Sequence, residues 1–385
     1  MPGDSGKVMK SNPSIRAMRV DALTLLDLGE REILNSIVFP SIARSRAGLS
    51  GIGDDCAILE LPQGIEQPVL VATADPCPKP VIFELFDPDY WHYGWLTAVI
   101  NLSDLASMGA QAAGLLVSTV MPDGMPAADY QRFWDGLVAA SDTWGCKIVG
   151  GNIKDGPAFS ADGMALGWCS RDKAMQRVGC QAGDLVYAIG ESGTFWSAVL
   201  HHSKVPDLVL PADEQRMVER ALTHPQARIR EGLALARSGL VTSCMDASDG
   251  VLGCLMELGR RNGLDVHLDA EHWEPHPLVC RIADATGVDI AKIMLSWGDW
   301  QLVVTVPPGR KFALENLMHD LETRTTLLGR MSSGAGRVWL DSAMGWQELE
   351  NLASERFSKR SYFTGGIRAY MDWFISAPLF AGENR

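Results

Sequence analysis

The stretch that decides the fold spans residues 91–110 and reads WHYGWLTAVINLSDLASMGA. Its apolar side chains recur at spacings of three and four residues, which predicts a helix with one broad apolar face. Gly109 stands where such a helix would end. Asp104 interrupts the apolar face. Taken alone, the pattern favours a carboxylate that faces solvent; the alternative is a carboxylate near the core, which then needs a cation or a hydrogen-bond donor.

Length and composition set the class of protein. The chain has 385 residues, which predicts two domains, and it is 46% hydrophobic and 21% charged, enough for a substantial core. No apolar run approaches eighteen residues, so we expect no membrane span. Residues 1–20 predict a disordered tail, and residues 1–12 lack the apolar segment of a secretory signal.

Net charge and cysteine content limit the kinds of ligand and partner that we expect. The net charge of −13 argues against a nucleic-acid surface, which needs an excess of Lys and Arg. The negative charge does not exclude phosphate ligands, because acidic sites can bind phosphates through Mg²⁺. The eight cysteines form no C-x-x-C pair, which favours a reduced, cytoplasmic protein over a zinc or redox site.

Strand and helix patterns alternate in the first half, which indicates an α/β unit. The expected helices are 30–39, 91–110, 127–144, 196–202, 213–222, 229–238, 251–262 and 311–323, and the expected strands are 69–75, 114–120, 147–149, 164–169, 185–189, 241–245 and 302–306. Pro40 is expected to end the first helix. Residues 179–184 form a turn-rich joint to a second unit. The weakly patterned chain after Ser332 predicts a small appended subdomain.

Acidic residues gather at strand ends and helix starts, where α/β proteins collect ligands. They are Asp54 and Asp55 after a Gly-x-Gly turn, Asp75 and Asp246 at strand ends, Asp104, and Asp249 at a helix start. Carboxylates gathered without cations raise one another's pKa values, and a divalent cation such as Mg²⁺ removes that repulsion. Backbone N–H groups near Gly53, Gly150, Gly151 and Gly250 are candidate phosphate donors. No Walker A motif occurs.

The order of five motifs resembles the thiamine-monophosphate kinase family, within the superfamily of aminoimidazole ribonucleotide synthetase and selenophosphate synthetase. The motifs are Gly51–Asp55, Thr73–Asp75, Asn101–Ala110, Gly150–Asn152 and Asp246–Gly250. The resemblance implies an α/β ATP-binding domain (21–172), an α+β domain (173–345) and a C-terminal extension (346–385). It also implies a homodimer whose N-terminal domains pair into a β-barrel, with ATP and several Mg²⁺ ions in a cleft.

The resemblance assigns roles by position. The implied metal ligands are Asp55, Thr73, Asp75, Asp104, Asp246 and Asp249, and the implied nucleotide-binding residues are Gly151, Asn152, Arg177 and Ser248. Asp104 and Asp249 are the residues we expect to serve catalysis.

The sequence departs from the family's pattern at four positions, which concern the metal ligands and the phosphate acceptor. Asn152 replaces a metal-binding Asp, Cys254 replaces a further Asp, Ile82 replaces a substrate-contacting His, and Gly298 replaces a Glu that meets thiamine. We therefore expect an ATP- and Mg²⁺-dependent phosphotransferase acting on a small molecule other than thiamine monophosphate. A ligase, cyclase or dehydratase, and a non-catalytic nucleotide-binding protein, are the alternatives. Trp297 and Trp300 either stack on a planar substrate or serve as core aromatics.

Overall fold

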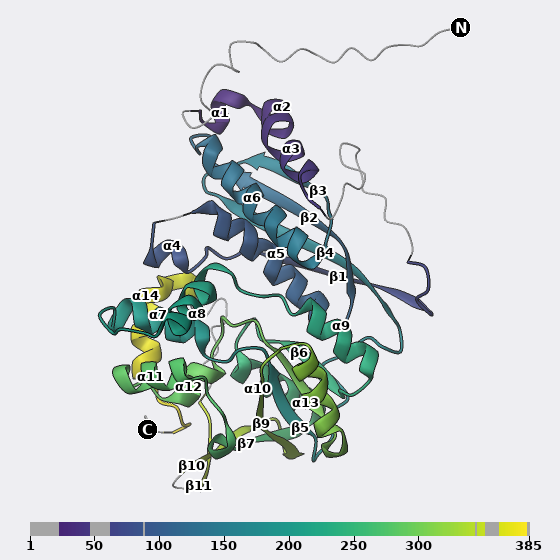
Figure 1. The fold of residues 1–385 in the computed structure, drawn as a ribbon, viewed down its shortest axis with the longest axis vertical. Helices are drawn as coiled ribbons and strands as arrows, with labels where there is room; N and C mark the ends of the chain where they lie inside the picture. Colours follow the sequence, from purple (N-terminus) through teal and green to yellow (C-terminus); the bar gives the residue numbers. More distant parts are fainter. Residues whose placement is uncertain (1–22, 47–61, 88, 343–344, 351–361, 383–385) are drawn as a thin grey trace.

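The computed structural model describes residues 23–46, 62–87, 89–342, 345–350 and 362–382 (Figure 1). Within these ranges the strands form two sheets, one of four strands and one of seven. Helices accompany both sheets, so the mixed α/β character expected from the sequence is confirmed. The domain limits 21–172, 173–345 and 346–385 stay a prediction.

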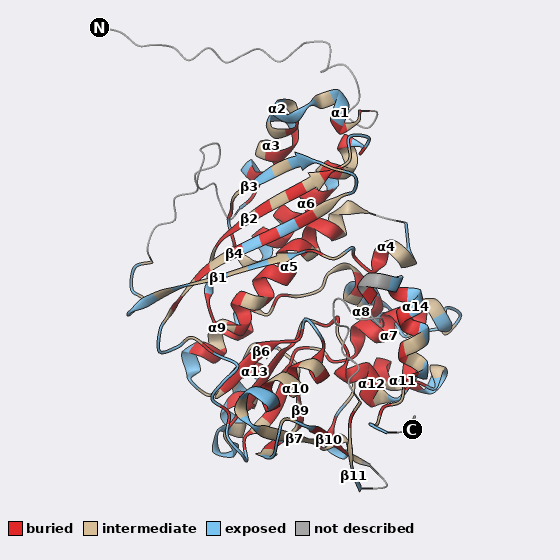
Figure 2. Cartoon of the chain, turned by 180° about the vertical axis from the view of Figure 1, so that it is seen from behind, coloured by how far each residue is buried: buried red, intermediate tan, exposed pale blue. Residues whose placement is uncertain are grey.

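The first sheet has the strand order β1-β4-β2-β3. Its strands are β1 (Pro68–Pro76), β2 (Gln111–Met121), β3 (Ile148–Asp155) and β4 (Ser160–Ser170). Only the β2–β3 pair is parallel. Helices α5 (Tyr90–Ser107) and α6 (Ala127–Trp144) cover one face, and Figure 2 shows the other face without a helix over it. Among the described residues the sheet is open and no barrel is closed, so pairing between two chains stays a prediction.

The second sheet has the strand order β11-β10-β7-β9-β5-β8-β6. Its strands are β5 (Leu185–Ile189), β6 (Ser243–Asp246), β7 (Leu264–Leu268), β8 (Leu302–Val306), β9 (Thr325–Ser333), β10 (Val338–Ser342) and β11 (Gly345–Glu348). Strands β6 and β8 are buried along their whole length, including the polar residues Ser243, Asp246 and Thr305.

The remaining helices surround both sheets. They are α1 (Leu25–Leu28), α2 (Glu30–Ile33), α3 (Phe39–Ala43), α4 (Ile82–Leu85), α7 (Thr194–Lys204), α8 (Ala212–Thr223), α9 (Ile229–Ser238), α10 (Val251–Asn262), α11 (Pro277–Thr286), α12 (Ile290–Leu295), α13 (Lys311–Asp320) and α14 (Tyr362–Ser376). Every helix within the described ranges is too short or too polar to cross a lipid bilayer.

Two expectations from the sequence were wrong. Pro40 does not end the first helical segment, because a five-residue π-helix (Leu34–Val38) leads into α3, where proline lies in the first turn and needs no N–H partner. The chain after Ser332 is not a separate subdomain in its described part. Strand β10 pairs in parallel with β7, and Phe374 of α14 stacks on Trp196 of α7 in the same core.

Helix α5 packs so closely against its neighbours that its backbone contacts theirs. A Cβ on Gly94 would lie 1.9 Å from the carbonyl oxygen of Phe133 in α6, and one on Gly136 of α6 would lie 1.9 Å from that of Trp91. On another side, a Cβ on Gly232 of α9 would lie 2.1 Å from the carbonyl oxygen of Ala106. Glycine is therefore needed at these three positions, and the two crossings fix α5 between α6 and α9.

We expect Gly94→Ala to lower the free energy of unfolding by about 3 kcal/mol, because its methyl group meets backbone atoms that cannot move aside. Gly124→Ala is the matched control: no atom lies within 4 Å of a Cβ there. Urea unfolding measures both variants, and equal midpoints for the two would contradict this account of the α5–α6 crossing.

Candidate active site

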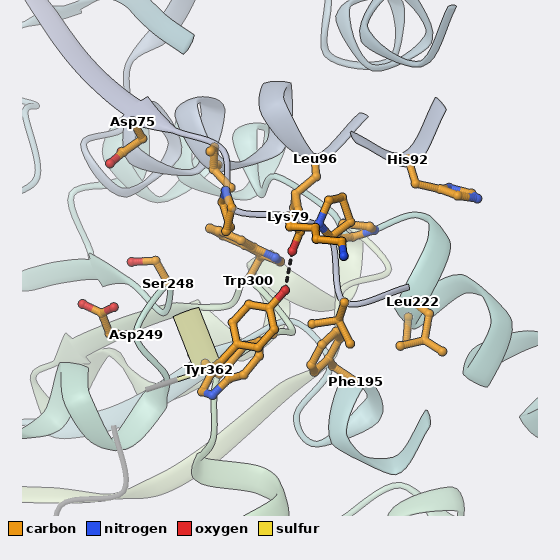
Figure 3. A pocket seen from close by; sticks show the side chains of 18 of the residues that line it. Asp75, Lys79, His92, Leu96, Phe195, Leu222, Ser248, Asp249, Trp300 and Tyr362 are labelled. Carbon is orange, nitrogen blue, oxygen red and sulfur yellow. Dashed lines mark hydrogen bonds between the residues drawn. The ribbon is translucent and has the colours of Figure 1, made fainter. Parts of the chain in front are cut away.

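A cavity of about 400 Å³ lies where β1, α5, α8, the β6–α10 turn and the start of α14 meet (Figure 3). Five of the residues predicted for the site line it, namely Asp75, Asp104, Asp246, Ser248 and Asp249. The structure therefore brings together side chains that are up to 174 positions apart, from Asp75 to Asp249.

Local structure sets the position of each carboxylate. Asp75 lies near the end of β1, where its backbone N–H donates to Asn101 Oδ1 of α5 (3.1 Å). Asp246 is the last residue of β6, and Asp249 follows in the turn before α10. Gly250 in that turn has φ +95°, and a Cβ there would lie 2.9 Å from the backbone nitrogen of Trp297. The turn thus requires glycine.

Asp104 and Asp246 form an acidic pair that is largely shielded from solvent, since Asp246 is buried and Asp104 is half-buried. Thr73 Oγ1 donates to Asp104 Oδ2 (2.5 Å), and Ser103 Oγ donates to Asp246 Oδ2 (3.0 Å). Burial and then the charge of Asp246 raise the pKa of Asp104. Burial also raises the pKa of Asp246, against the opposing effects of the Ser103 hydrogen bond and the charge of Arg177. Asp104 lines the cavity rather than facing bulk solvent, so the interpretation favoured by its helix alone was wrong.

The donor set fits Mg²⁺ bound together with phosphates. Asp246 Oδ1 is buried and has no hydrogen-bond partner among the described residues. Within the described part of the chain, no three His, Cys, Asp or Glu side chains are grouped as a ready metal site. Mg²⁺ commonly takes one or two carboxylates and completes its shell with phosphate and water oxygens, so it does not need such a group. Asp55 lies outside the described residues.

Other predicted residues lie away from the cavity lining. Gly151 and Asn152 are exposed on the edge strand β3, opposite Val117 and Ser118 of β2. Gly151 has φ +155°, and a Cβ there would lie 1.8 Å from the carbonyl oxygen of Val117, so close strand packing explains this glycine. Arg177 is exposed, yet near enough to lower the pKa of Asp246. The nucleotide-binding roles of these three residues stay predictions.

Several lining residues were not found from the sequence. Lys79, His92, Phe195 and Tyr362 line the cavity with Trp297 and Trp300. For Lys79 a signal existed, because it lies in the proline-rich segment after Asp75. Trp300 carries its own structural signal, since its φ is +53°, a left-handed conformation that non-glycine residues rarely adopt and that clusters at functional sites.

Comparison with known proteins identifies the family. Residues 53–169 match the N-terminal domain of AIR synthase related proteins, and residues 181–339 match their C-terminal domain. The chain belongs to the AIR synthase-related family. The superfamily predicted from the motifs is therefore confirmed.

Members of the thiamine-monophosphate kinase group are similar to this chain. The kinase of Salmonella typhimurium is 27% identical over 296 residues, which cover 77% of this chain and 88% of that protein. The crystal structure of the kinase from Stenotrophomonas maltophilia has a TM-score of 0.67 at 27% identity and covers 80% of this chain and 96% of that one. A ThiL protein complexed with AMPPCP and TMP has the same fold, with a TM-score of 0.61, 23% identity and coverage of 85% and 99%.

Asp299 holds one wall of the cavity in place. Its carboxylate is buried and accepts hydrogen bonds from the backbone N–H groups of Gly193 and Phe195 (both 2.7 Å) and from the hydroxyl of Thr194. Because these groups start α7, Asp299 caps that helix and fixes Phe195. Burial raises the pKa of Asp299 to about 6, although the three hydrogen bonds oppose the rise.

This shift predicts a pH dependence of stability. Between a pKa of 3.8 in the unfolded chain and about 6 in the folded chain, the folded state holds more protons. The free energy of unfolding therefore falls as pH rises through this interval, by about 3 kcal/mol for this group. Asp299→Asn removes that contribution, so urea unfolding from pH 4 to 7 should give a flatter profile than the unmodified chain.

Asp284→Asn is the control for this measurement, because Asp284 is exposed on α11. Its profile should follow that of the unmodified chain. Parallel profiles for Asp299→Asn and the unmodified chain would show that Asp299 does not titrate in this way.

Proposed function

We propose that this protein is an ATP- and Mg²⁺-dependent phosphotransferase acting on a small molecule other than thiamine monophosphate. The observation that carries the proposal is the acidic pair Asp104 and Asp246, with Asp246 Oδ1 left without a partner among the described residues. The named kinases that the chain resembles, and the AMPPCP complex of one such fold, support the nucleotide. The metal ligands, nucleotide contacts and cytoplasmic location are parts of the same proposal.

Different residues of the site have different roles in the proposed reaction. Asp75, Asp104, Asp246 and Asp249, with Asp55, would hold Mg²⁺, which when bound neutralises and orients the nucleotide phosphates. Thr73 and Ser103 each hold one carboxylate oxygen of the acidic pair in place. Ser248 and the N-terminus of α10 offer hydroxyl and N–H donors to phosphate oxygens. Positioning and charge neutralisation are what phosphoryl transfer needs most.

The two positions at which the family contacts the phosphate acceptor support a substrate other than thiamine monophosphate. A Cβ on Gly298 would lie 2.2 Å from the ring of Phe195, so the ring fills the space that a glutamate would need there. Ile82, at the place of the family's substrate-contacting histidine, is buried in the core.

The ligase, cyclase or dehydratase alternative uses the same phosphate chemistry, and the family takes its name from a synthase. A kinase releases ADP and a phosphorylated acceptor, whereas the alternative releases ADP, free phosphate and a condensed or dehydrated product. Nucleotide binding without turnover would point to a non-catalytic protein with an incomplete metal site at Asn152. Incubation with Mg·ATP and fractionated metabolites, followed by mass spectrometry, separates the three.

Asp104→Asn should weaken Mg²⁺-dependent nucleotide binding and lower turnover by about 10²–10³-fold, because one positioned charge of the site is lost. The amide keeps an oxygen for Thr73 and removes the repulsion with Asp246. Stability of the metal-free protein at pH 8 should therefore stay the same or rise by about 1 kcal/mol. Calorimetry with Mg·AMPPCP and thermal unfolding measure both effects.

Asp123→Asn serves as the control, because Asp123 is exposed and does not line the cavity. Unchanged nucleotide affinity in Asp104→Asn would remove the basis of the proposal.

A homodimer is part of the proposal, with the open face of the first sheet as its interface. Three consecutive pairs on this face join β1 to β4, namely Leu70 to Trp168, Ala72 to Leu166 and Ala74 to Met164. Leu70 and Met164 are 52% and 46% exposed. An apolar sheet face of this kind is costly in water and is usually covered by another layer.

Met164→Glu should therefore shift the protein from dimer to monomer in sedimentation velocity, since it buries a charge in the proposed interface. Phe312→Glu is the matched control, because Phe312 is a 74% exposed hydrophobic residue on α13, away from the sheet. A monomeric unmodified protein, or a dimer insensitive to Met164→Glu, would contradict the interface.

A further inference from the structure

The cavity has two chemically different ends. In Figure 3, Asp75, Ser248 and Asp249 lie on one side, whereas His92 and Leu222 lie on the far side, with Trp300 and Tyr362 between them. We define an aromatic end, which comprises the far side and the rings in contact with it, by Lys79, His92, Leu96, Phe195, Leu222, Trp297 and Tyr362. The proposed function uses the acidic side, and it leaves the aromatic end without a role beyond the absence of a thiamine contact.

One wall of the aromatic end is a row of rings. The ring centroids of Phe195 and Trp297 lie 5.2 Å apart, and those of Trp297 and Tyr362 lie 5.3 Å apart. Tyr362 is fixed by a hydrogen bond from its hydroxyl to the carbonyl oxygen of Lys79. Leu96 of α5 and Leu222 of α8 also line this end. Rigid aromatic and aliphatic walls of this kind suit a flat, largely apolar group.

The charges of the aromatic end are unlike those of the acidic side. All four carboxylates among the described lining residues belong to the Mg²⁺ site proposed above, and Lys79 is the one Lys or Arg of that lining. The Lys79 ammonium forms no ion pair with any described residue. Burial lowers the pKa of His92, whose Nδ1 lies 3.3 Å from the carbonyl oxygen of Thr223, so the imidazole is neutral at pH 7. At Gly298 the Phe195 ring excludes a side chain that could supply a negative charge.

We infer that the aromatic end binds the second substrate through a planar group that is uncharged or anionic, and that it discriminates against planar cations. This inference rests on the proposed function only in assuming that nucleotide and second substrate share the cavity. A cation placed here would lose hydration, would find no carboxylate among the residues that define this end, and would meet the Lys79 ammonium. The Glu84 carboxylate, whose charge acts on Tyr362, lies behind the lining. Attraction of a cation to the ring faces opposes this effect and offsets only part of it.

The test uses the full chain and three bicyclic probes of one size: 2-naphthoate (anionic), 2-naphthamide (neutral) and N-methylquinolinium (cationic). Ligand-observed NMR titrations should give dissociation constants at least tenfold lower for 2-naphthoate and 2-naphthamide than for N-methylquinolinium. Lys79→Met should weaken 2-naphthoate binding about threefold to tenfold and leave 2-naphthamide unchanged, since only the charge interaction is lost.

A matched pair of variants isolates the sign of the charge. Leu96 is half-buried on α5 and lines the cavity. Leu96→Glu should reverse the order of the probes in favour of N-methylquinolinium, whereas the isosteric Leu96→Gln should keep the original order. If Leu96→Glu does not fold, the exposed Lys79 still provides the charge test through Lys79→Met.

The outcomes separate this inference from the proposed function. Equal or tighter binding of N-methylquinolinium by the unmodified chain, or no binding of any probe at millimolar concentration, overturns the inference. Displacement of the probes by Mg·AMPPCP also overturns it, because the aromatic end would then hold the nucleotide base. Failure of Mg·AMPPCP to bind, with the probe order kept, refutes the proposed function and leaves the charge selectivity standing.

Discussion

The closely packed helix α5 is the constraint on which the rest of the structure depends. Glycines at its crossings with α6 and α9 allow backbone to contact backbone. These contacts fix both the position of the helix along its axis and its rotation about that axis. Three of its polar residues then reach both sheets: Asn101 bonds to the backbone of Asp75 on β1, Asp104 accepts from Thr73 on β1, and Ser103 donates to Asp246 on β6. One helix therefore sets the separation of carboxylates that come from two different sheets.

The same arrangement holds Asp104 and Asp246 close enough to repel each other when both are charged. Two partly or fully buried acids, each with a raised pKa, are unfavourable in the free protein and become favourable when positive charge arrives. Each acid keeps one hydrogen-bond donor, enough to hold its orientation and too few to satisfy its charge. The hydrophobic core around α5 supplies the stability that this repulsion removes.

Much of the fold could be predicted from local pattern. Helices 127–144, 229–238 and 251–262 and strands 185–189 and 302–306 have the observed bounds, because each carries a strong period of 3.6 or an unbroken apolar run. Strands β7, β9, β10 and β11 were missed. Strands β7, β10 and β11 are short, and β7, β9 and β10 gain their order from partners distant in sequence. The carboxylates could be predicted because they end recognisable elements. Phe195 and Tyr362 could not, because only tertiary packing brings α7 and α14 to the cavity.

The bond between Tyr362 and Lys79 joins residues that are 283 positions apart. A ribosome adds residues from the N-terminus onward, so the first sheet and α5 emerge long before α14. During synthesis the carboxylates of β1 and α5 therefore exist well before the tyrosine that borders the same cavity. That part of the cavity wall can form only once α14 has been made and has packed against the earlier segments.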